Sequence, residues 1–192
     1  AYSLLNNQLL GHHELGDGWF MDWSASYGKT GSDEPDRRQV MFRRDGGKIS
    51  LFKLNKQETM RYFGELDEKE IVGDLKLGYL FGENNRVRLG ATYKDKTRDF
   101  NSIRFYYNLN QLDPNIDSVY DTDDYLNQEN IANGILPIIR DKQDKYNYFA
   151  GNDIWAGFID VEYYLMPSLL VSLGLRLEHS QQWVRYWTDA SV

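Results

Sequence analysis

The chain has 192 residues, a net charge of −7 and no cysteine, and its aromatic residues comprise 14 Tyr, 9 Phe and 5 Trp. The negative charge argues against nucleic acid as a partner, and the lack of cysteine excludes disulfides and thiolate metal sites. No continuous apolar run approaches the roughly 20 residues that a membrane-spanning helix needs. A soluble β-protein and a membrane β-barrel both remain open, because polar lumen residues and loops lower the average hydrophobicity of a barrel.

The first predicted element is a hairpin around Gly16-Asp17-Gly18. In "ELGDGWFMDWSASYG" the odd positions from Trp19 to Tyr27 are apolar, whereas the even positions include Asp22 and two serines. A period of two residues is typical of a β-strand with two different faces. The preceding strand, around 7–15, alternates only weakly. The chain opens at "AYSLLNNQLL", without the regions of a signal peptide, so we expect a mature segment or an internal fragment.

Residues 29–69 follow as a first long loop. Within it, "QVMF" and "KISLF" flank Asp45-Gly46-Gly47 and predict a minor hairpin. A second main hairpin is predicted in "IVGDLKLGYLFGENNRVRLGATYKDK", around the turn Glu83-Asn84-Asn85. An acidic second long loop is expected over residues 108–145.

The third main hairpin is "DVEYYLMPSLLVSLGLRLEH", with strands on either side of Met166-Pro167-Ser168. In each hairpin both strands have their apolar residues at odd positions. Residues directly opposite in an antiparallel sheet share a face, so odd positions must pair with odd positions. This requires a loop of odd length, and three-residue loops meet the requirement. Opposite charges then meet across strands. The predicted register places His12 opposite Asp22, Asp74 opposite Lys94, and Arg176 diagonal to Asp160.

The apolar faces have the height and the ends of a membrane-spanning surface. From Trp19 to Tyr27 a strand rises about 26 Å, or about 20 Å when tilted, close to the apolar band of about 25 Å in membrane barrels. Aromatic residues mark both ends of these faces, as expected at two membrane interfaces. They are Trp19, Tyr79, Phe81 and Tyr163 near the short turns, and Tyr27, Tyr93 and Trp155 near the long loops.

We therefore predict an all-β fold of antiparallel up-and-down hairpins that forms part of a large transmembrane β-barrel, with short periplasmic turns and long extracellular loops. Residues 1–192 would form one segment of a single barrel domain, because about six strands are too few to close a membrane barrel. The polar faces would line the lumen. Their charged residues are the candidate site residues: Asp22, Asp74, Lys76, Arg88, Lys94, Asp160, Glu162, Arg176 and Glu178.

Other clusters suggest no catalytic or metal chemistry. No spacing of a catalytic triad or P-loop appears, so we predict no enzymatic activity, metal or cofactor. The acidic cluster at 121–124 lacks the spacing of an EF-hand and is interpreted as a solvated loop. His12 and His13 are adjacent in a strand and point to opposite faces. For Arg37, Arg38, Arg43 and Arg44, pairing with nearby acids is favoured over phosphate binding.

Four stretches resemble, in the same order, the TonB-dependent outer-membrane receptors of Bacteroidota. "WSASYGKTGSDEPDRRQVMFRR" (23–44) is similar to a strand that enters an extracellular loop through an acidic-Pro-Asp-Arg motif. "YKDKTRDFNSIRF" (93–105) is similar to a strand end with Lys/Arg-Asp-Phe-Asn. "YFAGNDIWAGFIDVEYYL" (148–165) and "LLVSLGLRLEHSQQ" (169–182) resemble an Ala-Gly-aromatic strand and the Gly-hydrophobic-Arg-hydrophobic-Glu strand after it.

The resemblance implies a barrel of about 22 strands with a plugged lumen, energised through TonB in the outer membrane of a Gram-negative cell. Neither the plug nor a TonB-contacting segment is in these residues. The implied partners are outer-membrane lipid, the plug domain of the same full-length chain, the TonB complex and a scarce nutrient such as a siderophore, saccharide or peptide. Two alternatives stay open: a passive porin-like or adhesin-like barrel, and a soluble carbohydrate-binding β-sandwich.

Overall fold

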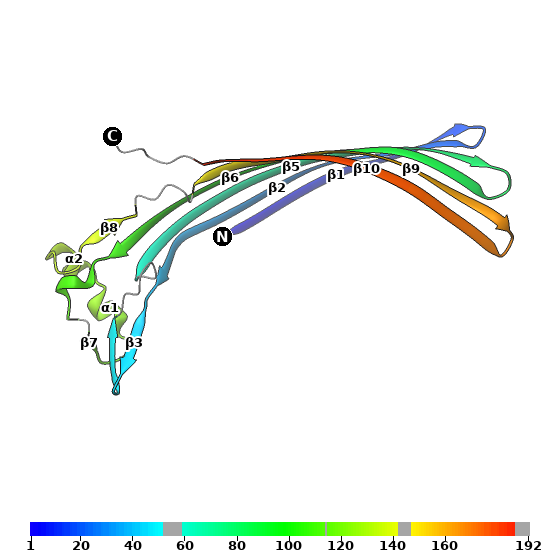
Figure 1. Cartoon of the computed structure of the whole chain (residues 1–192). Coiled ribbons are helices and arrows are strands. Elements are labelled where there is room, and N and C mark those ends of the chain that lie inside the picture. The colour runs from blue at the N-terminus through cyan, green and yellow to red at the C-terminus, as the bar shows by residue number, and fades with distance from the viewer. Residues whose placement is uncertain (52–58, 114, 142–146, 187–192) are drawn as a thin grey trace.

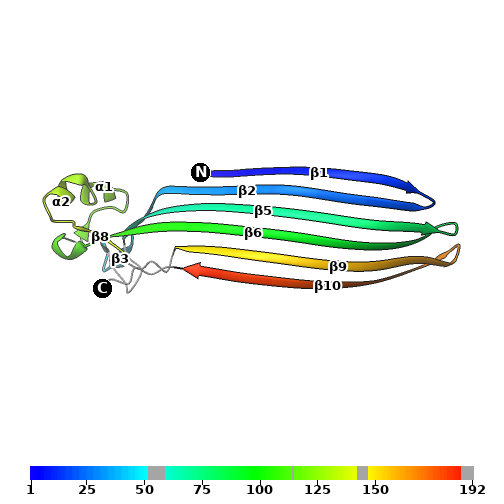
Figure 2. The same cartoon turned by 90° about the horizontal axis from the view of Figure 1, so that it is seen from above.

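In the computed structural model, which describes residues 1–51, 59–113, 115–141 and 147–186, six long strands form one antiparallel sheet in the order β1-β2-β5-β6-β9-β10 (Figures 1 and 2). Consecutive long strands are joined by short turns at one end and by the longer segments at the other. The predicted all-β class of antiparallel hairpins is confirmed. The long strands are β1 (Tyr2–Gly16), β2 (Trp19–Gln39), β5 (Met60–Phe81), β6 (Asn85–Tyr107), β9 (Tyr148–Met166) and β10 (Leu169–Tyr186).

The central strands are longer than the apolar pattern indicated. β2, β5 and β6 have 21, 22 and 23 residues, or roughly 70 Å each at about 3.3 Å per residue. These bounds correct the predicted loop 29–69, because β2 continues to Gln39 and β5 already begins at Met60. Both faces of these strand ends carry polar residues, so the alternation that reveals a strand is missing there. The second predicted loop, 108–145, lies between the ends of β6 and β9.

Both longer connections pack together at the far end of the sheet (Figure 1). The predicted minor hairpin is confirmed as β3 (Phe42–Asp45) and β4 (Lys48–Leu51), and β4 also pairs with β7 (Asn115–Ile116). Leu51, Ile116 and Leu136 are buried there. The second connection also contains η1 (Leu109–Gln111), α1 (Thr122–Tyr125), α2 (Gln128–Ala132) and β8 (Ile138–Arg140), which pairs with the end of β6.

The three turns confirm the predicted register in two hairpins and correct it in one. In the first, His12 lies opposite Asp22 as predicted, and in the third Asp160 lies opposite Gly174, which leaves Arg176 diagonal to it. In the second, the turn is Gly82-Glu83-Asn84, one residue earlier than predicted, because Gly82 adopts a φ of 62° that favours glycine. Asp74 therefore lies opposite Thr92, and Lys94 lies opposite Val72.

The first and third turns also differ from the prediction in their detail. Gly16 pairs with Trp19, so only Asp17 and Gly18 remain unpaired in the first turn, and Leu15 is left over as a bulge. The third turn has the same form. Met166 pairs with Leu169, so only Pro167 and Ser168 remain unpaired in the turn. Leu165 is left over as a bulge, after which Tyr164 pairs with Leu170. The bulge restores the register that a three-residue loop would have produced.

Candidate functional site

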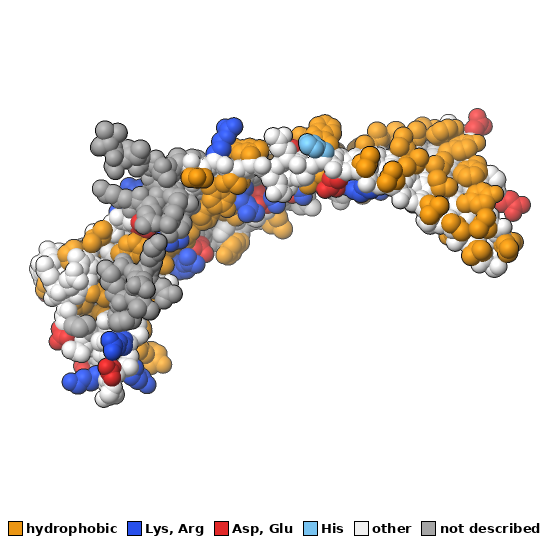
Figure 3. Space-filling view, in the orientation of Figure 1, with side chains coloured by type: hydrophobic (Ala, Val, Ile, Leu, Met, Phe, Trp, Pro, Cys, Tyr) orange, Lys and Arg blue, Asp and Glu red, His pale blue; other side chains and the backbone are white. Residues whose placement is uncertain are grey.

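The six long strands present two chemically different faces. Apart from the pairs Gly16–Trp19 and Met166–Leu169 next to the turns, and the part of β2 beyond Glu34, paired residues of the six long strands are both odd-numbered or both even-numbered. Odd side chains therefore form one face and even side chains the other. We call these the apolar face and the polar face. On the apolar face Leu173 and Leu177 are 72% and 70% exposed. Hydrophobic side chains gather over the end of the sheet that carries the short turns (Figure 3).

Such continuous exposure is unusual for a soluble monomer. Exposed members of the apolar face include Leu75, Leu77, Leu89, Trp155, Ile159, Tyr163, Leu173, Leu175 and Leu177.

Aromatic rings contact one another at both borders of the apolar face. Near the short turns, ring centroids lie 4.7 Å apart for Trp19 and Tyr79, 6.2 Å for Tyr79 and Phe81, and 6.4 Å for Phe81 and Tyr163. At the other border, the rings of Tyr93 and Trp155 lie 4.2 Å apart. Rings of β2, β5 and β9 thus form one belt and rings of β6 and β9 the other, with an aliphatic surface between them, the arrangement found at membrane interfaces.

The apolar face is slanted relative to the strands. On β5 it extends to Ile71, but the residues level with Ile71 on β6 and β9 are Asp95 and Asp153. On these strands the apolar face ends two residues closer to the short turns, at the Tyr93–Trp155 pair. At the turn end the apolar face is shifted in the same direction. β2 begins at Trp19, which is level with Val161 of β9, whereas the apolar residues of β9 continue beyond Val161 to Leu165.

Beyond the slanted border the same face becomes polar. Lys29 forms an ion pair with Asp67 at 3.0 Å. A hydrogen bond with Asp153 on the neighbouring strand, together with burial and repulsion, raises the pKa of Asp95. The strands therefore continue well past the apolar surface into a region where charged groups meet water.

The turn end of the polar face holds an ion-pair cluster across β6 and β9. The Arg88 guanidinium donates to Asp160 at 2.8 Å and to Glu162 at 3.1 Å, and Arg86 donates to Glu162 at 2.7 Å. These side chains are between 19% and 35% exposed. The register brings the two bases of β6 opposite the two acids of β9, so the charges compensate one another.

The middle of the polar face is held by single contacts between neighbouring strands. Asp74 accepts hydrogen bonds from Ser24 at 3.2 Å and from Thr92 at 2.7 Å. The His12 Nδ1 and Asp22 Oδ1 atoms are 2.6 Å apart. Lys76, opposite Asp22, has no ion pair with any residue that the structure describes. On β10, Arg176 contacts Glu178 of the same strand at 3.1 Å.

A second cluster lies on the polar face, further from the short turns than the Tyr93–Trp155 pair. Lys96 contacts Glu68 at 2.6 Å, Lys94 contacts Glu70 at 2.9 Å, and the Arg98 guanidinium donates to Glu68. Burial raises the pKa of Glu68, but the hydrogen bonds from Lys96 and Arg98 outweigh it and hold that pKa below its usual value. The hydrogen bond from Lys94 likewise lowers the pKa of Glu70.

All nine predicted site residues are even-numbered and lie on the polar face. Sequence reasoning missed Arg86, which sits next to the turn, and Glu68, because it was assigned to a loop. It also missed Lys96 and Arg98, although the even-numbered positions of β6 from 94 to 98 are uniformly basic and could have revealed them. Orientation of this face towards a lumen stays a prediction.

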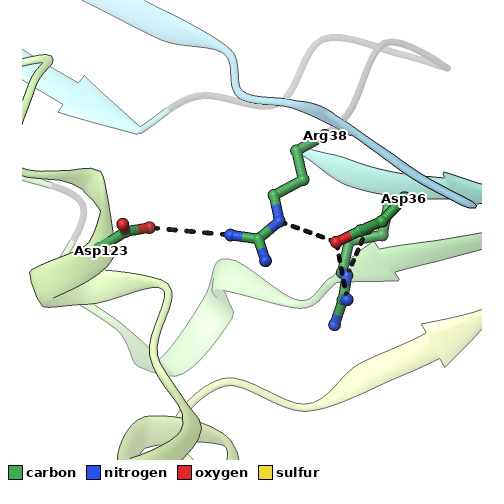
Figure 4. Close-up of polar contacts among 4 residues, drawn as sticks. Asp36, Arg38 and Asp123 are labelled. Carbon is green, nitrogen blue, oxygen red and sulfur yellow. Dashed lines mark hydrogen bonds and ion pairs between the residues drawn. The ribbon is translucent and has the colours of Figure 1, made fainter.

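The arginine-rich segment of β2 pairs with nearby acids. Arg37 lies 3.7 Å from Glu34, and Arg61 of β5 donates two hydrogen bonds of 2.9 Å to Asp36. Arg38 bridges Asp36 at 3.1 Å and Asp123 of α1 at 3.9 Å (Figure 4). The favoured interpretation of charge pairing thus fits these arginines, and Asp123 of the acidic cluster joins the same network.

Two kinds of feature are absent from the described part of the chain. No helix there is long and apolar enough to cross a membrane. No group of three or more His, Asp or Glu side chains within those ranges is arranged to hold a metal ion.

Long antiparallel strands, an exposed apolar face with aromatic borders and an opposite charged face are the features of an outer-membrane barrel wall. No protein-family model and no curated protein matches the chain. Among solved structures it is similar to the pyoverdine outer membrane receptor FpvA from Pseudomonas aeruginosa PAO1, bound to pyoverdine, with a TM-score of 0.56 at 14% identity. The match covers 95% of this chain and 24% of that receptor, so the chain spans about a quarter of its length.

Proposed function

We propose that this chain forms part of the wall of an outer-membrane active transporter of the TonB-dependent type, which imports a scarce nutrient. The apolar face contacts lipid and the polar face lines the lumen, against a plug domain of the full-length protein. The short turns then lie in the periplasm and the two longer connections outside the cell. The observation that carries the proposal is the apolar face, bordered by aromatic belts and backed by a polar face with ion pairs between strands.

Six strands joined edge to edge support a larger barrel. Among the described residues β1 pairs only with β2 and β10 only with β9, so both edges have free backbone groups. In lipid every such group needs a partner, which a closed barrel supplies. Further strands of the full-length protein would meet β1 and β10. The similarity to an outer-membrane receptor bound to pyoverdine supports a transporter of this class, and the nutrient stays open.

The lipid-facing assignment is tested by an Arg substitution in the full-length protein. Leu173 lies midway along the apolar part of β10, so Leu173→Arg should cost about 2–4 kcal/mol and strongly reduce folding into the outer membrane. Ser172→Arg is the matched control, because Ser172 lies on the polar face opposite Glu162. Heat-modifiable migration on gels measures the folded barrel. Equal folding of the two variants would contradict the assignment.

Energy coupling separates active import from a passive porin-like or adhesin-like barrel. Uptake through a TonB-dependent transporter should stop when a protonophore collapses the inner-membrane gradient. A passive barrel would continue to admit solute. Solubility of the full-length protein without detergent would instead favour the carbohydrate-binding sandwich.

A further inference from the structure

A row of aromatic side chains crosses the polar face beyond the charged clusters. The register places Phe100 of β6 level with Tyr148 of β9, and Tyr148 level with Tyr186 of β10. The ring centroids of Phe100 and Tyr148 are 5.3 Å apart, and Tyr186 is 68% exposed. We call these three residues the aromatic row. It lies on the face opposite the proposed lipid surface, so anchoring in a membrane does not explain it.

Cations lie on both sides of the aromatic row. Arg98 is two residues nearer to the short turns than Phe100, in the cluster where Lys94, Lys96 and Arg98 form ion pairs, among the described residues, with the two acids Glu68 and Glu70. Two steps beyond the row, the Tyr62 ring has the Arg37 guanidinium at 4.4 Å and the Arg104 guanidinium at 5.4 Å from its centroid. The cluster carries one more positive charge than negative, so this part of the face attracts anions.

Small side chains leave a hollow next to the aromatic row. Ala150 of β9 and Val184 of β10 are paired with each other, one step from Tyr148 and Tyr186. They form the floor of an open hollow of about 420 Å³, with Tyr148, Lys96, Arg98 and Asn152 around it. Its size lies within the range of roughly 300–1,000 Å³ that is usual for small-molecule sites.

We propose that the aromatic row and this hollow bind a ligand group that combines a flat ring with a negative charge. The ring stacks on Tyr148 and Tyr186, as aromatic pairs do, and the anionic group meets Lys96 and Arg98. This inference rests on the proposed function, because it identifies the chemistry of the solute that the polar face would meet. An uncharged saccharide fits the rings but makes no use of the excess positive charge.

Saturation-transfer NMR on the detergent-solubilised full-length protein tests the ligand class with three probes. Salicylate has a flat ring and a carboxylate, salicylamide has the same ring without the charge, and maltotriose is an uncharged saccharide. We expect salicylate to bind best, and Tyr148→Ala with Tyr186→Ala to weaken it by about fivefold or more. Tyr186→Ala alone, at an exposed position, gives the same direction of change should the double variant not fold.

Tyr164→Ala is the matched control. Tyr164 lies on the same strand and face as Tyr148 but near the short turns, and this variant should keep wild-type salicylate binding. Heat-modifiable migration of every variant separates the two proposals, because a wild type that does not insert contradicts the barrel itself. Unchanged salicylate binding in inserted Tyr186→Ala, equal binding of salicylamide, or preference for maltotriose would each overturn the ligand class.

Discussion

At the scale of single residues, the polar face is stabilised more by ion pairs that the register brings together across strands than by isolated charges. Arg88 meets two acids of the next strand, and all three side chains are less than a third exposed. An exposed ion pair contributes about 1 kcal/mol or less, whereas removing one partner of a buried pair leaves an uncompensated charge and costs several kcal/mol. These partly buried groups lie between the two cases. Lys76 has the same kind of position on the face but no ion pair among the described residues.

We therefore expect Arg88→Met to lower the free energy of unfolding by about 1–2 kcal/mol, because Asp160 and Glu162 lose their common partner. Lys76→Met should change it by about 0.5 kcal/mol or less. Urea unfolding of the full-length protein in detergent micelles, followed by tryptophan fluorescence, measures both. Equal losses in the two variants would show that the cross-strand network adds nothing beyond a single charge.

At the scale of elements, a bulge in β2 redirects the arginine-rich segment. Glu34 pairs with Gly64 and Arg37 pairs with Tyr62, so Pro35 and Asp36 together oppose Phe63. Proline lacks the N–H that a regular ladder uses, which suits it to such a position. The extra residue changes the parity, so Arg37 reaches Tyr62 on the polar face. Asp36 meanwhile binds Arg61 and Arg38.

Asp36→Ala should loosen the connection between β6 and β9, because Arg38 links Asp36 to Asp123 of that connection. We expect trypsin to cleave after the exposed Arg140 about fivefold faster, which corresponds to roughly 1 kcal/mol of local opening. Asp45→Ala is the control, since Asp45 contacts Arg43 in the exposed β3–β4 hairpin. Unchanged cleavage in Asp36→Ala would show that other contacts hold this connection.

The sequence predicted elements where one face was apolar and failed where both faces were polar. Alternation from Trp19 to Tyr27 identified its strand, and parity then determined the register of His12 with Asp22. The same pattern disappears beyond Tyr27, so the sequence alone predicts a loop where β2 continues to Gln39. The second turn was misplaced by one residue, because Gly82 and Asn85 are both able to take a left-handed conformation. Glu68 lies in the part of β5 that lacks alternation, so the sequence does not predict its cluster.

At the scale of the whole molecule, the slant of the apolar face relates the sheet to the membrane. The turns are staggered in the same direction, since β2 begins level with Val161 while β9 continues to Met166. Strands of a closed barrel are tilted by about 35–45° and staggered in register, so a flat membrane crosses them obliquely. The slant therefore supports a tilted wall of a larger barrel. It also predicts that residues paired in one row across the strands lie at different depths in the membrane.

Leu75 and Leu177 test this geometry because they belong to one row, Leu75–Ala91–Gly157–Leu177. Leu75 lies near the middle of the apolar part of β5, whereas Leu177 is the last apolar residue on this face of β10 before His179. Leu75→Arg should cost about 2–4 kcal/mol in the full-length protein, and Leu177→Arg about 0–1 kcal/mol. Denaturant titration of protein refolded into lipid vesicles gives both values. Equal costs would mean that the membrane runs along the rows of the sheet, and the tilt inferred from the slant would be wrong.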